Sequence, residues 1–200
     1  MSTGRAERGT SLVELLICCG LLGLLMTGVL AVMVANNSYL RNSEARLDMQ
    51  REALQSLRTL TRELTESDRY AVAVDTDSIV FASPRDMAAS KITFDPRGRL
   101  QWHKYVCYYK DPNYNGTGQS VMARKVLGLA TPATDVPPAP AVAVVRDNPS
   151  LTPRVLAHYI DSFTATITPA GPVELDVVVK MKHYGRTYGM EIKSKVFLRN

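Results

Sequence analysis

Residues 10–35 read TSLVELLICCGLLGLLMTGVLAVMVA, and this stretch decides how the chain is organised. No charged residue occurs between Glu14 and Arg41, so residues 15–35 form an uncharged, mostly apolar run. At about 1.5 Å per residue this run would extend about 31 Å as a helix, close to the thickness of the hydrocarbon core of a bilayer. We therefore predict that residues 10–35 are the transmembrane part of an N-terminal helix.

A secretory signal peptide is the alternative interpretation of this run. Signal peptides have an apolar region of about 7 to 15 residues, followed by small residues at the cleavage site. The run here is longer, and Met33 stands where cleavage after Ala35 would need a small residue. Arg5 and Arg8 precede the run, so the positive-inside rule predicts a cytoplasmic N-terminus and an extracytoplasmic C-terminal part. The sequence thus favours a single-pass membrane protein.

The helical pattern continues beyond the predicted span, through an amphipathic part at residues 36–69. The first proline is Pro84. A narrow apolar stripe recurs at helical spacing: Leu40, Leu47, Leu54, Leu57, Thr61 and Leu64. We expect this stripe to lie across a sheet of the same chain, because the sustained heptad pairs of a coiled coil are missing. One helix from Ser11 to about Asp68 would have roughly 58 residues and a length on the order of 87 Å.

The other faces of this amphipathic part carry interleaved charges, which is typical of a solvated helix surface. Arginines are balanced by acidic residues, namely Glu44, Asp48, Glu52, Glu63, Glu66 and Asp68. The whole chain of 200 residues has a formal net charge of +5. This mildly basic balance does not call for a nucleic-acid partner.

The remaining residues, 70–200, are predicted to form a β-rich globular head. Cys18 and Cys19 lie in the predicted span, so Cys107 is left alone and no disulfide can form within the head. The segments richest in β-branched and aromatic residues predict strands at 78–82, 91–95, 99–109, 120–129 and 155–168. We therefore expect an α+β fold, in which the long N-terminal helix packs on an antiparallel β-sheet domain.

Turn and loop residues divide this head. The sequences DTDS at 75–78 and DPRG at 95–98 predict turns. Residues 129–153 contain six of the eleven prolines, so we predict a long proline-rich surface loop there.

The last part of the head predicts a β-hairpin with a defined register. Residues 173–182 alternate apolar and polar side chains, and residues 188–198 provide a matching apolar face. If Met181 faces Tyr188, Asp176 lies opposite Lys193 and Glu174 lies opposite Lys195. Such opposed charges contribute about 0.2–1 kcal/mol each and favour this register over a slipped one.

No arrangement of catalytic or cofactor-binding residues occurs in the sequence. The three histidines, His103, His158 and His183, stand far apart, without a cysteine or carboxylate at metal-ligand spacing. Neither a nucleophile elbow nor a phosphate-binding glycine loop is present. We therefore predict that the protein is not an enzyme and has no cofactor.

One stretch, DPNYNG at 111–116, matches the first half of an EF-hand calcium loop. Asp111, Asn113 and Asn115 alternate there, as the first ligands of such a loop do. The match then fails, because Met122 stands at the twelfth position, where a carboxylate should supply two oxygens. A hairpin turn at Asn115 and Gly116 accounts for the same residues, so we assign no metal.

The N-terminal residues closely resemble the type IV prepilin cleavage and methylation motif. The motif comprises a short basic leader ending in Gly9, the residues Thr10 to Glu14 (TSLVE), and a long apolar helix. In that family a prepilin peptidase cleaves after the glycine and methylates the new N-terminal residue. The resemblance therefore implies a leader at 1–9, cleavage between Gly9 and Thr10, N-methylation of Thr10, and Glu14 as the fifth residue of the mature chain.

The resemblance also implies a role for Glu14 in assembly. A charge at the centre of a bilayer costs about 2.5–3.5 kcal/mol, and less near the interface where Glu14 should lie. In a filament this carboxylate can face the terminal amine of a neighbouring subunit, an attraction that is stronger in a medium of low dielectric. The alternative is an interfacial carboxylate that only marks the end of the span.

The order of helix, strand-rich head and closing KVFLRN is similar to W-type minor pilins and J-type minor pseudopilins of type II secretion. This similarity implies the pilin fold and a low-copy structural subunit that initiates or caps a filament. Its partners would be other pilin or pseudopilin subunits, the prepilin peptidase, the inner-membrane assembly platform and, before assembly, the bilayer. Two other functions stay open: a single-pass, membrane-anchored extracytoplasmic binding domain, and a tip adhesin or DNA-uptake pilin.

Overall fold

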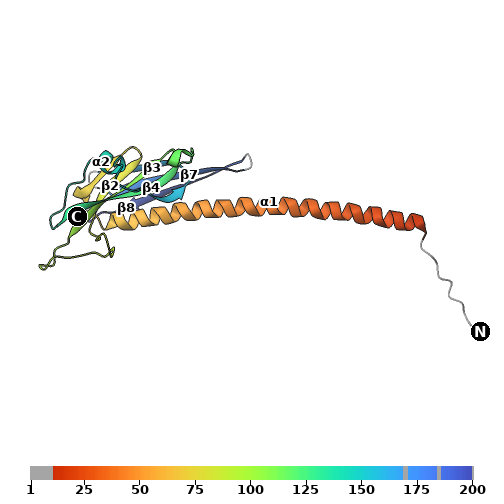
Figure 1. Ribbon diagram of the computed structural model, residues 1–200, viewed down its shortest axis with the longest axis horizontal. Helices are drawn as coiled ribbons and strands as arrows, with labels where there is room; N and C mark the ends of the chain where they lie inside the picture. Colours follow the sequence, from red (N-terminus) through yellow and green to blue (C-terminus); the bar gives the residue numbers. More distant parts are fainter. Residues whose placement is uncertain (1–10, 169–170, 184–185, 200) are drawn as a thin grey trace, which may run out of the picture. The chain divides into compact units, whose positions relative to one another are not determined.

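The computed structural model describes residues 11–168, 171–183 and 186–199. The chain divides into two compact units, Met1–Ala45 and Arg46–Asn200. The long helix α1, Leu12–Thr65, contributes to both units, and all the strands lie in the second unit, which we call the head (Figure 1). The predicted α+β class, with one long N-terminal helix and antiparallel sheets, is confirmed.

The helix α1 begins and ends close to the predicted residues. It has 54 residues, starts at Leu12 and ends at Thr65, a few residues before the expected Asp68. Asp68 instead caps the short 3-10 helix η1, Arg69–Ala71, because its side chain accepts a hydrogen bond from the backbone N–H of Tyr70 at 2.9 Å. By length and composition α1 is able to cross a membrane, and none of its most apolar window is buried within the chain.

Two antiparallel sheets form the head. The five-stranded sheet has the order β1-β2-β3-β4-β5, and the three-stranded sheet has the order β6-β7-β8. The strands of the first are β1 Val72–Asp75, β2 Ser78–Ser83, β3 Trp102–Asp111, β4 Val121–Ala133 and β5 Arg154–His158; those of the second are β6 Ile160–Ile167, β7 Val173–His183 and β8 Arg186–Val196. β1 was not among the predicted strands, and the predicted turn at 75–78 connects it to β2.

The head-domain part of α1 packs on these sheets through a face that only partly coincides with the predicted stripe. The buried apolar residues are Met49, Ala53, Leu57, Leu60 and Leu64, whose spacing is helical. Of the predicted stripe, Leu57 and Leu64 are buried, but Leu40, Leu47 and Leu54 are 51%, 60% and 42% exposed. The prediction was therefore wrong for the first half of the stripe. The small residues Ala53 and Ser56 also lie on the buried face.

Both faces of the central strands are covered, which explains why all six residues of β2 are buried. The short helix α2, Val142–Arg146, covers one face: Val142 and Val145 pack with Cys107 and Tyr109 of β3. Tyr108, between those two, points to the other face and reaches α1.

The helix α2 lies within the segment that was predicted to be a loop. Residues 129–153 are thus not one long surface loop, because β4 continues to Ala133 and α2 follows. Lys125 holds the end of α2, donating to the backbone oxygens of Arg146 at 2.6 Å and Asn148 at 3.0 Å. Arg146 in turn pairs with Asp75 at 3.3 Å, at the turn between β1 and β2. These contacts fix the proline-rich segment against the sheet.

Tyr159 divides one predicted strand into two. Residues 155–168 were expected to be continuous, but β5 pairs with β4 and β6 pairs with β7. Tyr159 has a φ of 62°, in the left-handed region that bulky residues rarely adopt. Its backbone oxygen accepts a hydrogen bond from Lys180 N–H at 2.9 Å. This bend moves the chain from one sheet to the other.

The C-terminal hairpin has the predicted register. Met181 pairs with Tyr188, Asp176 with Lys193, and Glu174 with Lys195. Lys195 Nζ lies 2.7 Å from Glu174 Oε1, and Lys193 Nζ lies 3.5 Å from Asp176 Oδ2. The predicted turn at 95–98 is also confirmed, since Gly98 N–H donates to Asp95 O at 2.9 Å. The predicted strand at 91–95 is wrong: this segment forms only the isolated bridges Arg85–Ile92 and Phe94–Leu100.

Candidate functional site

The first described residues contain part of the predicted processing and assembly site. Gly9 and Thr10 lie outside the described residues, whereas Glu14 stands in the first turn of α1. Its Oε2 accepts a hydrogen bond from the backbone N–H of Ser11 at 3.0 Å. A carboxylate at this place satisfies a helix donor that has no partner in the helix and interacts favourably with the helix dipole. Glu14 thus caps the helix within its own chain.

The segment after Glu14 presents an apolar surface on every side. All residues from Leu15 to Ala35 are exposed, with Leu24 at 73% and Val34 at 68%. Single exposed apolar residues are ordinary, but a helix that is apolar all round needs lipid or protein around it. The geometry of this unit agrees with a membrane span.

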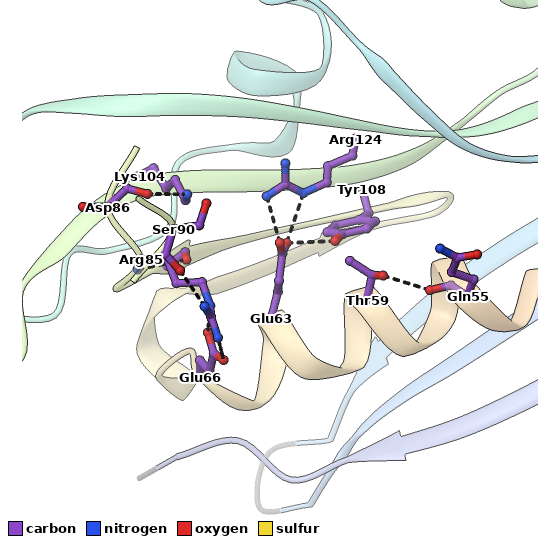
Figure 2. Close-up of polar contacts among 11 residues, drawn as sticks. Gln55, Thr59, Glu63, Glu66, Arg85, Asp86, Ser90, Lys104, Tyr108 and Arg124 are labelled. Atoms are coloured by element: carbon purple, nitrogen blue, oxygen red, sulfur yellow. Dashed lines mark hydrogen bonds and ion pairs between the residues drawn. The ribbon is translucent and has the colours of Figure 1, made fainter. Parts of the chain in front are cut away.

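A buried polar cluster lies in the head, where α1 packs on β3 and β4. Glu63 of α1 is 8% exposed, and its Oε2 accepts a hydrogen bond from Tyr108 Oη at 2.8 Å. Arg124 donates to both oxygens of the same carboxylate, from Nε at 3.1 Å and from Nη2 at 2.9 Å (Figure 2). Tyr108 and Arg124 are register partners on β3 and β4, so the sheet presents both donors at one place.

Glu63 was predicted to lie on a solvated helix surface, and that prediction was wrong. Glu63 follows the buried Leu60 by three residues, which places it on the same face of α1. That spacing from Leu60 is the sequence signal that could have identified it. Burial and the charge of Glu63 raise the pKa of the Tyr108 hydroxyl. Burial is the largest single influence on the pKa of Arg124 and lowers it, but the charges and hydrogen bonds of Glu63 and Tyr108 together raise it above its ordinary value.

A second ion pair joins the end of α1 to the segment after β2. Arg85 donates from Nε to Glu66 Oε2 at 2.6 Å and from Nη1 to the backbone oxygen of Ser90 at 2.6 Å. Its Nη2 also bonds to Glu66 Oε1. The hydrogen bond with Glu66 is the main cause that raises the pKa of Arg85. Since all three nitrogens of Arg85 have acceptors, this residue anchors the segment to α1.

Lys104 of β3 is a buried cation beside these pairs. It is 6% exposed, and its Nζ donates to the backbone oxygen of Asp86 at 2.9 Å (Figure 2). Among the described residues, no carboxylate oxygen lies within 4.0 Å of this ammonium group. Burial and then the positive charge of Arg124 lower the pKa of Lys104, while Glu63 and Asp86 act in the opposite direction.

These residues surround a groove of about 400 Å³ within the head. Its lining is mostly polar and contains the cations Arg62, Arg85, Lys104, Arg124 and Arg154; we call it the basic groove. Glu63 is the carboxylate that lines it. Nothing in the sequence indicated this groove, because its cations come from α1, β3, β4, β5 and the segment after β2.

The half EF-hand match has another explanation in the structure. Asp111 Oδ1 accepts a hydrogen bond from Asn113 N–H at 3.0 Å, and Asn113 Oδ1 accepts one from Gly118 N–H at 2.6 Å. Asn115 adopts a left-handed φ of 52°. Two of the three candidate ligands therefore hold the backbone of the loop between β3 and β4. In the described part of the chain, no three His, Cys, Asp or Glu side chains are grouped as a metal site.

Two histidines have structural partners, and the cysteine of the head is buried. His158 Nδ1 lies 3.0 Å from Glu52 Oε2, which also accepts from the His158 backbone N–H at 3.1 Å. His103 contacts the Thr93 hydroxyl through Nε2. Burial raises the pKa of the Cys107 thiol to about 12, so this thiol is not a reactive nucleophile.

The described residues thus contain two candidate functional surfaces: the apolar surface of α1 that follows Glu14, and the basic groove of the head. They are built from different parts of the chain. Comparison with protein-family models, curated proteins and solved structures finds no match in any of the three.

Proposed function

We propose that this chain is a minor pilin or pseudopilin, a structural subunit that helps to initiate or cap a type IV pilus or a type II secretion pseudopilus. The observation that carries the proposal is Glu14, one turn into an apolar helix that is exposed throughout its span and preceded by Arg8, Gly9 and Thr10. Before assembly the helix lies in the inner membrane, with its N-terminus in the cytoplasm and the head outside.

The chemistry of Glu14 supports a role in assembly. Cleavage after Gly9 creates a positively charged amine at Thr10, four residues before Glu14 in the sequence. Within its own chain Glu14 uses Oε2 for the Ser11 N–H. We propose that Oε1 accepts a hydrogen bond from the terminal amine of a neighbouring subunit. Packing the spans of several subunits together places this attraction in a medium of low dielectric, where it is strong.

The exposed leucines of α1 support the same function. Leu40, Leu47 and Leu54 recur at intervals of seven, which places them on one face of the helix, and all three side chains are exposed. Exposed apolar surface that follows one helix face is suited to packing against another helix. We therefore propose that this face, together with the membrane span, contacts neighbouring subunits.

Assembly of a Glu14→Ala variant tests the proposal. In the native host, we expect wild-type protein in sheared filaments or in the assembled pseudopilus. Glu14→Ala should remain in the membrane fraction in undiminished amount, because removing the charge does not hinder insertion. Glu44→Ala is the matched control, since Glu44 is also an exposed acid of α1. Normal incorporation of Glu14→Ala would contradict the proposed mechanism.

A membrane-anchored binding domain is the second candidate, and the basic groove favours it. In that case the leader stays attached and the protein does not enter filaments. A DNA-uptake or adhesive role at a filament tip would need the groove to bind a ligand while the protein is still processed as a pilin.

A further inference from the structure

We propose that the basic groove binds a phosphate group, through Lys104 and Arg124, as part of a small polar ligand. This inference is independent of filament assembly, because it rests only on residues of the head. The supporting observations are the hydrogen bonds that the groove cations make and the N–H groups that have no acceptor among the described residues.

Two of the three N–H groups of Lys104 have no acceptor among the described residues. An ammonium group has three N–H bonds, and one of them is directed to the Asp86 backbone oxygen. A buried cation without a carboxylate partner is costly, and a bound anion removes that cost. Burial and Arg124 lower the pKa of Lys104, which agrees with a site where positive charges are held close together.

Arg124 also has an N–H group without an acceptor among the described residues. Its Nε and Nη2 are occupied by Glu63, so Nη1 stays available among the described contacts. The pairing with Glu63 also fixes the plane of the guanidinium group. Such a fixed guanidinium is a good phosphate donor, because its N–H groups do not have to be ordered when the ligand binds.

The charge balance favours a dianion over a single carboxylate. Five cations line the groove, and Glu63, Glu66 and Asp86 are the acids beside them, which leaves an excess of about two positive charges. A phosphate monoester carries about −1.5 to −2 charges at neutral pH and therefore matches this excess.

The size and lining of the groove indicate the rest of the ligand. A volume of about 400 Å³ lies within the range of small-molecule sites, so the groove has room for more than the phosphate. Besides the cations, the lining includes the polar residues Gln55, Ser56, Thr59 and Ser90, with Val155 and Leu156 as the apolar residues. This lining suits a phosphorylated polyol such as a hexose phosphate.

Calorimetric titration of the full chain in detergent tests the proposal, with inorganic phosphate and a hexose phosphate as separate probes. We expect saturable binding of both, with the hexose phosphate tighter; equal affinity would assign the site to free phosphate. Lys104→Gln should weaken binding by about tenfold or more, because a charged donor is lost. Arg154→Gln should weaken it by about three- to fivefold, since Arg154 is exposed and its charge is partly screened.

Arg97→Gln is the control, because Arg97 is exposed and lies outside the groove. It should bind phosphate as the wild type does. Arg154→Gln keeps the test independent of any folding defect in Lys104→Gln. Wild-type affinity in both groove variants, no saturable phosphate binding, or binding of a polyglutamate peptide but not phosphate would each overturn the proposal. Leader cleavage is measured separately, so either proposal can fail without the other.

Discussion

Arg124 of β4 holds the carboxylate of Glu63 of α1 through two nitrogens, at 3.1 Å and 2.9 Å. The pair is largely removed from solvent, with 15% of the Arg124 side chain and 11% of the Glu63 side chain exposed. The pair joins the long helix to the five-stranded sheet. Tyr108 donates a further hydrogen bond to the same carboxylate.

Removing the Glu63 carboxylate should destabilise the head strongly. Glu63→Ala leaves Arg124 buried without a partner, and breaking a buried pair in this way costs about 3–5 kcal/mol. Glu52→Ala is the control, since 43% of the Glu52 side chain is exposed, and it should cost about 1 kcal/mol or less. Thermal and denaturant unfolding of the solubilised chain measure the difference. Equal stability of the two variants would show that the Glu63 pair does not hold the head together.

Substitutions of two leucines of α1 distinguish the observed packing face from the predicted one. Leu60 is fully buried, so Leu60→Ala should cost about 2–5 kcal/mol through loss of contacts and creation of a cavity. Leu54 is 42% exposed, so Leu54→Ala should change the stability of the solubilised chain by about 0.5 kcal/mol or less. The reverse order would mean that the original stripe faces the sheet.

Leu54→Ala should instead affect assembly. If the uncovered face of α1 contacts neighbouring subunits, this variant should be as stable as the wild type and less abundant in sheared filaments. Quantitative immunoblotting of the filament and membrane fractions measures the ratio. Undiminished incorporation of a Leu47→Ala, Leu54→Ala double variant would exclude this face from the assembly contact.

Lys104 should give the head a pH-dependent contribution to stability. Burial, followed by the charge of Arg124, lowers its pKa from the ordinary value of 10.5. Between the lowered folded-state pKa and 10.5, the unfolded chain binds a proton that the folded chain does not, so this contribution rises with pH. The Lys104→Gln variant lacks this pH-dependent contribution to stability. The stability of the wild type relative to Lys104→Gln should therefore increase as the pH approaches 10.5, and a constant difference would contradict this assignment.

The sequence predicted those parts of the fold that depend on local pattern. The extent of α1 follows from an uninterrupted apolar run and the absence of proline before Pro84. The register of β7 and β8 follows from two opposed charge pairs, because a shift by one residue would reverse every side chain.

The parts that the sequence did not predict depend on contacts between distant residues. Leucine spacing alone did not identify the packed face of α1, because the buried face also contains Met49 and the small residue Ala53, which the leucine stripe leaves out. The sheet change at Tyr159 depends on a left-handed backbone that its residue type does not favour. The basic groove is assembled from elements far apart in the chain, so no single motif indicates it.

The most direct measurement of the central claim is the intact mass of the chain after coexpression with a prepilin peptidase. If the chain is a pilin-type subunit, the product lacks residues 1–9 and carries one added methyl group on Thr10. A variant with Gly9→Val should keep the full-length mass under the same conditions. A wild-type product of full-length, unmethylated mass would contradict the assignment of the chain as a pilin or pseudopilin.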